Sequence, residues 1–448
     1  MTDLRVLKFG GTSMGSAEAM RSAGEIVKNT AGNKAVVVSA TAGTTNQLVE
    51  LARLSEAGEN WEGLLDEMIQ RHEQIISALE IECDISHFRG RLERILGMCE
   101  GAGNLIEAAP VLMDALYHFG EAVSATIFSQ YLNSIGVAAQ SFDSCNDGII
   151  HTDNKYMDAN VDFEETNRAI SEVLKPVVDS GKAAVVTGFF GRSKNGRCAT
   201  FARGGSDYSA GILGAGLGAD EVVLYKEEDG ICSADPRIVG KENVRVLDQI
   251  SYIEAVNMAL RGAKVLHPRT MDPTRKANIP IRIKNTFNPD APGTVINNEK
   301  RPTLKGVVRE EGVRVVTIKN PDMYEAAGFL SKVYGVFEEY GIPVDVVGTS
   351  EESFSSTVDR KIPDEMMKKL KGFGEVEVLR GQSIVGLVGH GIDDNGEDTI
   401  ARFFRALGVK PSLISKAAGG SSLTVAVAGT ETREAIRRIH AEFFEQGA

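Results

Sequence analysis

The sequence predicts an α/β protein: a large first part with a mainly parallel sheet, then two smaller βαββαβ domains. Three observations carry this prediction. Short apolar strands at 5–9 and 35–39 are each followed by glycine or hydroxyl residues and then by helical spacing. A segment rich in turn residues, 288–293, leads into a polar stretch near residue 300. Beyond it, a strand–helix–strand pattern occurs twice.

The first part of the chain alternates strands with helical segments, except in one region. Strand patterns return at 183–187, 221–225 and 279–283. Between about 60 and 135, apolar residues recur at helical spacing with few turn signals. We therefore predict a first domain at 1–300 with a helical insertion at about 60–118.

The second part reads as a weak internal repeat with two copies of about 65 residues. Its expected strands and helices lie at 315–318, 328–340 and 344–347, then at 384–388, 398–407, 413–414 and 423–427. A single βαββαβ sheet buries only one face well, so two copies together are the economical arrangement. We predict domains at 312–380 and 381–448.

Composition and charge exclude several kinds of protein. A chain of 448 residues is too long for one core. Its net charge of -13 argues against a nucleic-acid surface, which requires basic groups to neutralise phosphates. No apolar stretch approaches the ~20 residues of a membrane helix, and no leader is visible at the start, so we expect a cytoplasmic protein.

The five cysteines, at 83, 99, 145, 198 and 232, are widely spaced and form no Cys-x-x-Cys pair. This spacing favours neither a zinc site nor a disulfide framework. We therefore expect reduced thiols.

A glycine loop follows the first strand. Lys8 ends the strand, Gly10 and Gly11 follow, and two hydroxyl residues come next. Glycines let backbone N–H groups approach an anion closely, and a neighbouring lysine can reach the β- and γ-phosphates of ATP. A simple tight turn is the alternative, since the spacing is not that of a Walker A loop.

Five further segments accompany this loop. They are 39–46, 119–121 (where we expect Glu121 to open a helix), 203–207, 229–237 and 262–268. In order and spacing, these segments resemble the catalytic domain of aspartate kinases in the amino-acid kinase family. The resemblance covers essentially the whole chain, and the paired repeats match the ACT domains of that family.

The resemblance implies a three-layer amino-acid kinase fold and transfer of the γ-phosphoryl group of ATP to the β-carboxylate of L-aspartate. The product, 4-phospho-L-aspartate, begins lysine, threonine and methionine biosynthesis. Lys8 would stabilise the transferring group and Asp207 would orient Lys8. The substrate pocket would be formed by Ser39, Thr45, Glu121 (for the ammonium) and Arg203 (for the α-carboxylate).

For the nucleotide, the resemblance points to a second group of residues, with Mg²⁺ bridging phosphate oxygens through largely water ligands and no dedicated protein metal site. These residues are Lys8, Gly10, Gly11, Lys226, Glu227, Arg237 and Lys264. The chain departs from the family at Glu227, where aspartate is usual, and at Cys232, where an aromatic residue is common.

The first repeat resembles an effector-binding ACT domain. The implied contacts are Met323, Gly328, Leu330, Asp345 and Ser350. The expected inhibitor is an amino acid, lysine first and threonine second, and the repeats would join chains into a homodimer or higher oligomer.

Two other functions stay open at this point. One is a related acyl-phosphate-forming kinase that acts on glutamate or acetylglutamate. The other is a non-catalytic amino-acid sensor with a decayed kinase domain, suggested by Glu227 and Cys232.

Overall fold

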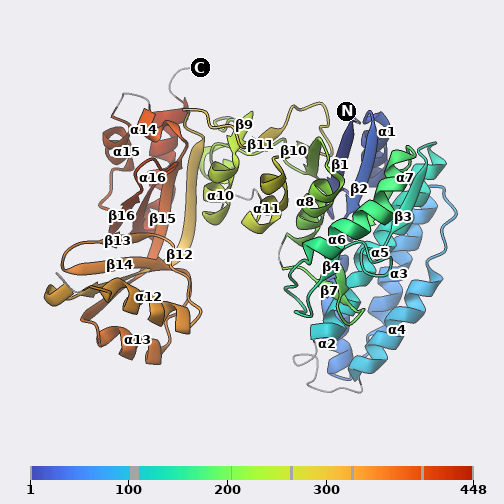
Figure 1. Cartoon of the computed structure of the whole chain (residues 1–448), viewed down its shortest axis with the longest axis horizontal. Helices are drawn as coiled ribbons and strands as arrows, with labels where there is room; N and C mark the ends of the chain where they lie inside the picture. Colours follow the sequence, from blue (N-terminus) through green and yellow to red (C-terminus); the bar gives the residue numbers. More distant parts are fainter. Residues whose placement is uncertain are drawn as a thin grey trace. The chain divides into compact units, whose positions relative to one another are not determined.

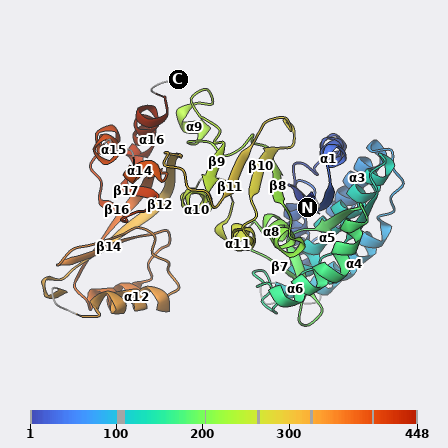
Figure 2. The same cartoon turned by 45° about the horizontal axis from the view of Figure 1, so that its top comes forward.

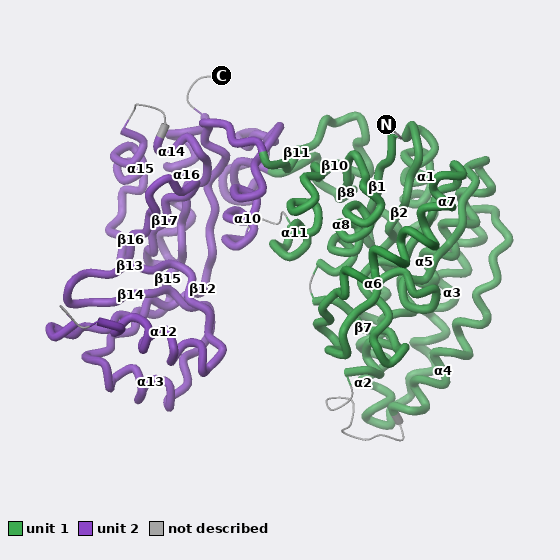
Figure 3. The backbone as a smooth tube through the Cα atoms, viewed as in Figure 1, with its two compact units in different colours: residues 1–231, 266–298 green, residues 232–265, 299–448 purple. Residues whose placement is uncertain are grey.

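The computed structural model describes residues 3–100, 110–202, 204–262, 266–323, 327–394 and 398–445. The chain divides into two compact units: residues 1–231 with 266–298, and residues 232–265 with 299–448 (Figure 3). One transition lies beside the predicted boundary at 300. In addition, the segment 232–265, which the sequence placed in the first domain, belongs by its contacts to the second unit.

Unit 1 is an α/β layer structure (Figure 1). Its elements are β1 (Leu4–Phe9), α1 (Ala17–Asn29), β2 (Asn33–Val38), α2 (Thr44–Glu56), α3 (Glu62–Ala78), α4 (Ser86–Glu100), α5 (Pro110–Ser134), β3 (Ala139–Phe142), β4 (His151–Thr152), α6 (Phe163–Ala169), η2 (Ile170–Leu174), α7 (Lys175–Asp179), β5 (Ala183–Thr187), β6 (Phe190–Ser193), β7 (Cys198–Thr200), α8 (Gly205–Leu217), β8 (Glu221–Lys226), α11 (Pro268–Ala277), β10 (Ile281–Asn285) and β11 (Thr294–Asn297).

The main sheet of unit 1 has the strand order β3-β5-β2-β1-β8-β10-β11. All neighbours except β10 and β11 pair in parallel. The central strands are continuous apolar runs because helices cover both of their faces. The mainly parallel sheet is thus confirmed, as is the helical region, in which α3, α4 and α5 lie alongside one another (Figure 1).

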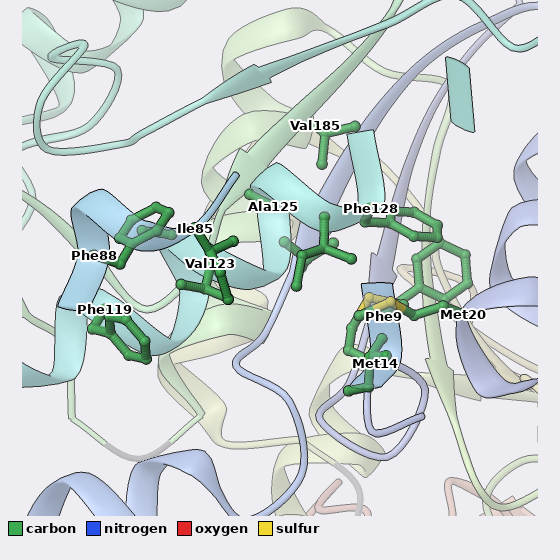
Figure 4. Close-up of a cluster of buried hydrophobic side chains, with 14 of the residues drawn as sticks. Phe9, Met14, Met20, Ile85, Phe88, Phe119, Val123, Ala125, Phe128 and Val185 are labelled. Carbon is green, nitrogen blue, oxygen red and sulfur yellow. The ribbon is translucent and has the colours of Figure 1, made fainter. Parts of the chain in front are cut away.

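Alternation along β1 gives its two faces different tasks. Phe9 points into the large core shared with α1 to α5, where its ring meets Phe128 edge-on at 5.9 Å (Figure 4). The same ring stacks on Tyr225 at 4.9 Å. Lys8, one position earlier, points to the opposite face, toward α8. The packed Phe9 therefore fixes the strand end that carries Lys8.

Unit 2 contains the two repeats and the segment 232–265 (Figure 2). Its elements are α9 (Pro236–Val239), β9 (Gln249–Ser251), α10 (Tyr252–Leu260), β12 (Gly306–Lys319), η3 (Pro321–Met323), α12 (Phe329–Glu339), β13 (Val347–Thr349), β14 (Ser353–Val358), α13 (Asp364–Lys371), β15 (Glu375–Val388), α14 (Gly391–Asp394), α15 (Thr399–Leu407), β16 (Leu413–Lys416), β17 (Ser422–Ala428), η4 (Gly429–Glu431), α16 (Thr432–His440) and η5 (Ala441–Glu445).

The two repeats share one six-stranded sheet, in the order β13-β14-β12-β15-β17-β16. Two long strands, β12 and β15, pair along their whole length and serve both repeats. The fourth strand of the second repeat is residues 306–311, so the first repeat is inserted into the second. The sequence predicted two separate segments, 312–380 and 381–448, and this prediction left residues 306–311 out of the second repeat.

Glycines mark the point where each long strand passes from one repeat to the other. Gly312 has φ 80° and Gly381 has φ 64°. The pairing register shifts beside Gly312. A left-handed residue in each strand lets the ladder kink and twist there, a conformation that is costly for residues with a Cβ.

One predicted strand in the first repeat is displaced. The sequence predicts a strand at 344–347, whereas β13 is Val347–Thr349. Before Val347 the two segments stay joined less regularly: the Thr357 N–H donates to the Val346 carbonyl at 2.9 Å, and the Val346 N–H donates to Thr357 Oγ1 at 3.0 Å. In the described part of the chain, no helix is long and apolar enough to span a bilayer.

Candidate functional site

The carboxyl ends of β1, β2 and β8 lie next to one another in the parallel sheet, and each is followed by predicted site residues. The Gly10-Gly11 loop follows β1, the segment 39–46 follows β2, and Lys226 ends β8. Open α/β sheets bind ligands outside the carboxyl ends of their strands. The structure therefore brings these predicted residues to one edge.

Lys8, Asp207 and Lys226 form the charged centre of this edge. Lys8 Nζ lies 2.6 Å from Asp207 Oδ1, and Lys226 Nζ lies 3.3 Å from Asp207 Oδ2. Burial opposes ionisation of Asp207, but the charges of Lys8 and then Lys226 outweigh it and hold the pKa of Asp207 well below its usual value. Two ammonium groups on one carboxylate leave a net positive centre, which suits a polyanion.

The glycine loop lies directly against this centre. A Cβ on Gly10 would stand 3.7 Å from Lys8 Nζ, and one on Gly11 would stand 3.1 Å from the carbonyl oxygen of Ala40. Larger residues would fill the space in front of Lys8. The two glycines therefore leave room for an anion to approach the backbone beside the lysine.

Glu121 lies in the middle of α5, not at a helix start, and this prediction is wrong. Gly120 also lies inside this helix. A Cβ at this position would come within 2.7 Å of the Ala40 Cβ, so the glycine allows α5 to pack closely against Ala40. Burial raises the pKa of Glu121 to about 8, against the opposing effects of the Ala40 N–H and the Lys8 charge. The raised pKa favours the neutral form of the Glu121 side chain.

The two predicted hydroxyl residues of the substrate pocket flank the loop after β2. Ser39 continues the ladder, with its N–H donating to the Phe9 carbonyl at 3.1 Å. Thr45 is exposed in the first turn of α2. Both therefore stand at the same edge as Lys8.

Of the remaining predicted residues, the described structure places only Glu227 at this edge. Arg203 and Lys264 lie outside the described residues. Glu227 is exposed and follows Lys226 directly. Arg237 belongs to unit 2, where its exposed guanidinium pairs with Asp235 at 2.7 Å.

Metal-ligating side chains are not gathered into a cluster in the described part of the chain. The described residues include no group of three or more His, Cys, Asp or Glu side chains that could hold a metal ion. Asp207, the buried acid nearest the glycine loop, is already paired with two lysines.

The predicted effector residues lie in the first repeat of unit 2. Gly328 caps the N-terminus of α12 with φ 81° and no side-chain cap, Leu330 is exposed in the first turn, and Met323 ends a 3-10 turn. Partial burial and the Asp359 charge raise the pKa of Asp345. Ser350 Oγ bonds Ser353 Oγ at 2.7 Å in the turn before β14.

The expectation of reduced thiols fails at two positions. Cys145 and Cys198 form a disulfide across 53 positions of sequence, with Cα atoms 5.4 Å apart. Arg192, on β6, pairs in register with Cys198 of β7 and donates from Nε to the Cys145 carbonyl at 2.8 Å, so both cysteines lie beside it. Spacing in the sequence carries no sign of this approach.

Thiol titration checks the disulfide. In denaturant without reductant we expect three reactive thiols per chain, since Cys83, Cys99 and Cys232 retain theirs, and five after reduction. A Cys145→Ser control should give four in both conditions. Five thiols in the unreduced parent would contradict the disulfide.

Sequence reasoning missed four residues around the loop after β2. Thr41, Thr44, Arg71 and His72 form a hydrogen-bonded chain there. Arg71 and His72 lie on α3 without any motif, so no sequence signal links them to the site. It also missed the buried contact of 2.7 Å between Ser13 Oγ and Thr286 Oγ1, beyond the ends of β1 and β10.

The two lysines at this sheet edge can neutralise several negative charges of a ligand, and the neighbouring acid Glu121 is buried away from water. This combination is typical of an α/β phosphotransferase whose acceptor is itself charged.

Comparison with known proteins gives the family. Residues 3–285 match the model of the amino acid kinase family. The chain is 32% identical to aspartokinase 1, chloroplastic, of Arabidopsis thaliana over 99% of its length and 80% of that relative. It is 31% identical to lysine-sensitive aspartokinase 3 of Escherichia coli, over 99% of this chain and 100% of the relative. This chain belongs to the amino acid kinase family.

The solved structures agree with the sequence comparison. Aspartokinase III of Escherichia coli, in complex with aspartate and ADP, matches with a TM-score of 0.83 and 29% identity. The match covers 98% of this chain and 100% of that one. The similarity thus extends over both units of the present chain.

Proposed function

We infer that this protein is an aspartate kinase, which transfers the γ-phosphoryl group of ATP to the β-carboxylate of L-aspartate. The observation that carries the inference is the Lys8–Asp207–Lys226 centre beside the buried acid Glu121. The lysines match a polyanionic donor, and the acid matches the ammonium of an amino-acid acceptor. Relatives solved or named as aspartokinases over the same length support this choice of acceptor.

The chemistry needs little beyond positioning and charge. A β-carboxylate oxygen of aspartate attacks the γ-phosphorus, and the bond from that phosphorus to the bridging oxygen of ADP breaks. The nucleophile is already ionised at neutral pH, so no general base is required. The barrier is repulsion between two anions, which Lys8 and Lys226 reduce.

The remaining residue roles are part of the same proposal. Arg203 would bind the α-carboxylate through its two-pronged guanidinium, and Ser39 with Thr45 would complete the pocket. Glu227, Arg237 and Lys264 would contact the nucleotide. Mg²⁺ would be held by phosphate oxygens and water, because the described side chains offer no cluster of their own.

A hydroxamate assay tests the function. Hydroxylamine traps acyl phosphates, so we expect ATP-dependent hydroxamate with aspartate and none above background with glutamate or acetylglutamate. Product with one of the other two acceptors would assign a related kinase. No product with any acceptor, in a protein that still binds amino acids, would make it a sensor.

We further propose that the repeats are ACT domains that bind an inhibitory amino acid, lysine first and threonine second, and join chains into a homodimer or larger oligomer. The open N-terminus of α12 at Gly328 suits a carboxylate, and Asp345 suits an ammonium. Inhibition then requires the effector to bind one of two conformations more tightly.

Asp345→Ala is expected to relieve this inhibition. The variant should need about tenfold more lysine for half inhibition, because the ammonium loses its charged partner. Its rate without lysine should match that of the parent. Asp364→Ala, an acid in the first turn of α13, is the control and should keep normal sensitivity. Unchanged inhibition in Asp345→Ala would place the effector elsewhere.

A further inference from the structure

A hydrogen-bonded chain joins helix α3 to residues 39–46, here called the substrate loop. His72 is fully buried, and its Nε2 lies 2.9 Å from Thr41 Oγ1. Thr41 Oγ1 lies 2.5 Å from Thr44 Oγ1, and Arg71 Nη2 donates to Thr44 Oγ1. The proposed reaction uses none of these four side chains directly.

The donor and the acceptor of each bond in this hydrogen-bonded chain can be assigned. His72 Nδ1 lies 2.7 Å from the Met68 carbonyl, which can only accept, so Nδ1 carries a hydrogen. Burial lowers the pKa of His72 to about 4, so the ring is neutral and Nε2 must accept from the Thr41 hydroxyl. Thr44 then donates to Thr41, and Arg71 donates to Thr44. The chain therefore runs in one direction, from Arg71 to Met68.

The substrate loop depends on this chain because it has no cap of its own. Helix α2 begins after Gly43, which has φ 83° and offers no side-chain hydrogen bond. Arg71 makes a second hydrogen bond to the same turn, in which its Nη1 donates to the Ala42 carbonyl at 2.8 Å. These hydrogen bonds come from residues of α3, and the hydroxyls of Thr41 and Thr44 are both engaged in the hydrogen-bonded chain.

The two hydroxyl residues of the loop that remain are the predicted substrate contacts. Thr44 is fully buried, whereas Thr45, the next residue, is exposed in the first turn of α2. On the other side of the loop, Ala40 packs against Gly120 and donates its N–H to Glu121. The hydrogen-bonded chain and Glu121 thus hold the loop from opposite sides.

We propose that Arg71, His72, Thr41 and Thr44 are positioning residues that fix the substrate loop and thereby set the affinity for aspartate. They act through Ser39, Thr45 and Glu121 without touching the substrate. This inference rests on the proposed function, since it assigns aspartate to that loop.

Paired substitutions at Thr44 test the proposal. Thr44→Val keeps the shape but removes the hydroxyl, so we expect the aspartate KM to rise about tenfold while the ATP KM changes less than about twofold. Thr44→Ser restores the hydroxyl and should return the aspartate KM to near the parent value. Thr166→Val removes an equally buried hydroxyl that bonds His151, far from the substrate loop in sequence, and should leave both KM values unchanged.

A second readout does not depend on turnover. Amide hydrogen exchange in residues 39–46 should be faster in Thr44→Val than in the parent or in Thr44→Ser. If Thr44→Val does not fold, Arg71→Met serves instead, with Arg53→Met, on the exposed side of α2, as its control.

The outcomes separate the two claims. A parent without aspartate-dependent turnover contradicts the proposed function, whatever the exchange data show. An active parent whose Thr44→Val and Arg71→Met variants keep both the aspartate KM and the exchange pattern overturns the positioning role. Equal rises in the aspartate and ATP KM would also overturn it, because they would indicate a general structural defect.

Discussion

Replacing Lys8 with methionine is expected to lower kcat by at least about 10²-fold, the scale of losing one preorganised electrostatic stabiliser. Methionine keeps the length of the side chain in its buried position on β1. What is lost is the charge that, in the proposed reaction, stabilises the transferring phosphoryl group. Steady-state kinetics at saturating ATP and aspartate measures the effect, and a nearly normal kcat would remove Lys8 from catalysis.

Loss of stability must be separated from loss of catalysis in this variant. Without Lys8, Asp207 loses its nearer ion pair and keeps the more distant one with Lys226, at 3.3 Å, so the fold is expected to weaken. Adding Asp207→Asn removes the stranded charge and should recover much of the melting temperature without recovering kcat. Lys34→Met, which removes a lysine that caps α1 carbonyls, is the control and should retain activity.

The aspartate KM is expected to fall as pH rises from about 6 to 8. Glu121 is protonated in the empty site, since its pKa is raised to about 8, but it must be ionised to bind an ammonium. Binding below pH 8 therefore releases about one proton, and affinity changes by up to about tenfold per pH unit. Calorimetry in buffers of different ionisation enthalpy counts that proton directly.

Glu121→Gln should abolish this pH dependence and raise the aspartate KM by about 10²-fold, because a buried charged contact is lost. Asp114→Asn removes another buried acid of α5, which bonds Thr200 instead, and should keep the pH dependence. The same pH profile in Glu121→Gln as in the parent would show that another group titrates.

The stability of the protein without aspartate is expected to fall as pH rises, whereas its affinity for aspartate rises. Below pH 4.5 Glu121 is protonated in both the folded and the unfolded state. Between 4.5 and about 8 only the unfolded state is ionised, so the free energy of unfolding falls by up to about 1.4 kcal/mol per pH unit. Above that range the loss is complete. Glu121→Gln should remove this contribution to the slope.

The sequence predicted those parts of the fold that depend on local pattern. The buried strands β1, β2, β5 and β8 are largely apolar runs, and each was expected within two residues of its observed ends. Parallel pairing then places the ends of three of these strands at one edge. Lys8 and Lys226 were assigned to one site through the family resemblance, and parallel pairing is the physical reason that the two side chains meet.

Features that depend on distant contacts could not be predicted in this way. Gly120 looks like a break before a helix, and only the approach of Ala40 shows that it is a packing position. Arg71 and His72 are ordinary helical residues until the substrate loop is placed beside α3. The disulfide of Cys145 with Cys198 joins positions that no spacing rule connects.

Strand exchange and the assignment of 232–265 have a practical consequence for anyone who wants to express half of this protein. Ser233 bonds His440 at 2.9 Å, its carbonyl accepts from Val307, and Ile238 and Val239 pack with Ile436 and Ile439 of α16. A truncation after residue 300 would strip these apolar side chains of their cover and is expected to aggregate. A fragment that starts at residue 300 would lack segment 232–265, whose apolar side chains complete its core. Cutting this chain into working halves therefore takes three cuts, at about 231, 265 and 298, and a designed linker to close each gap.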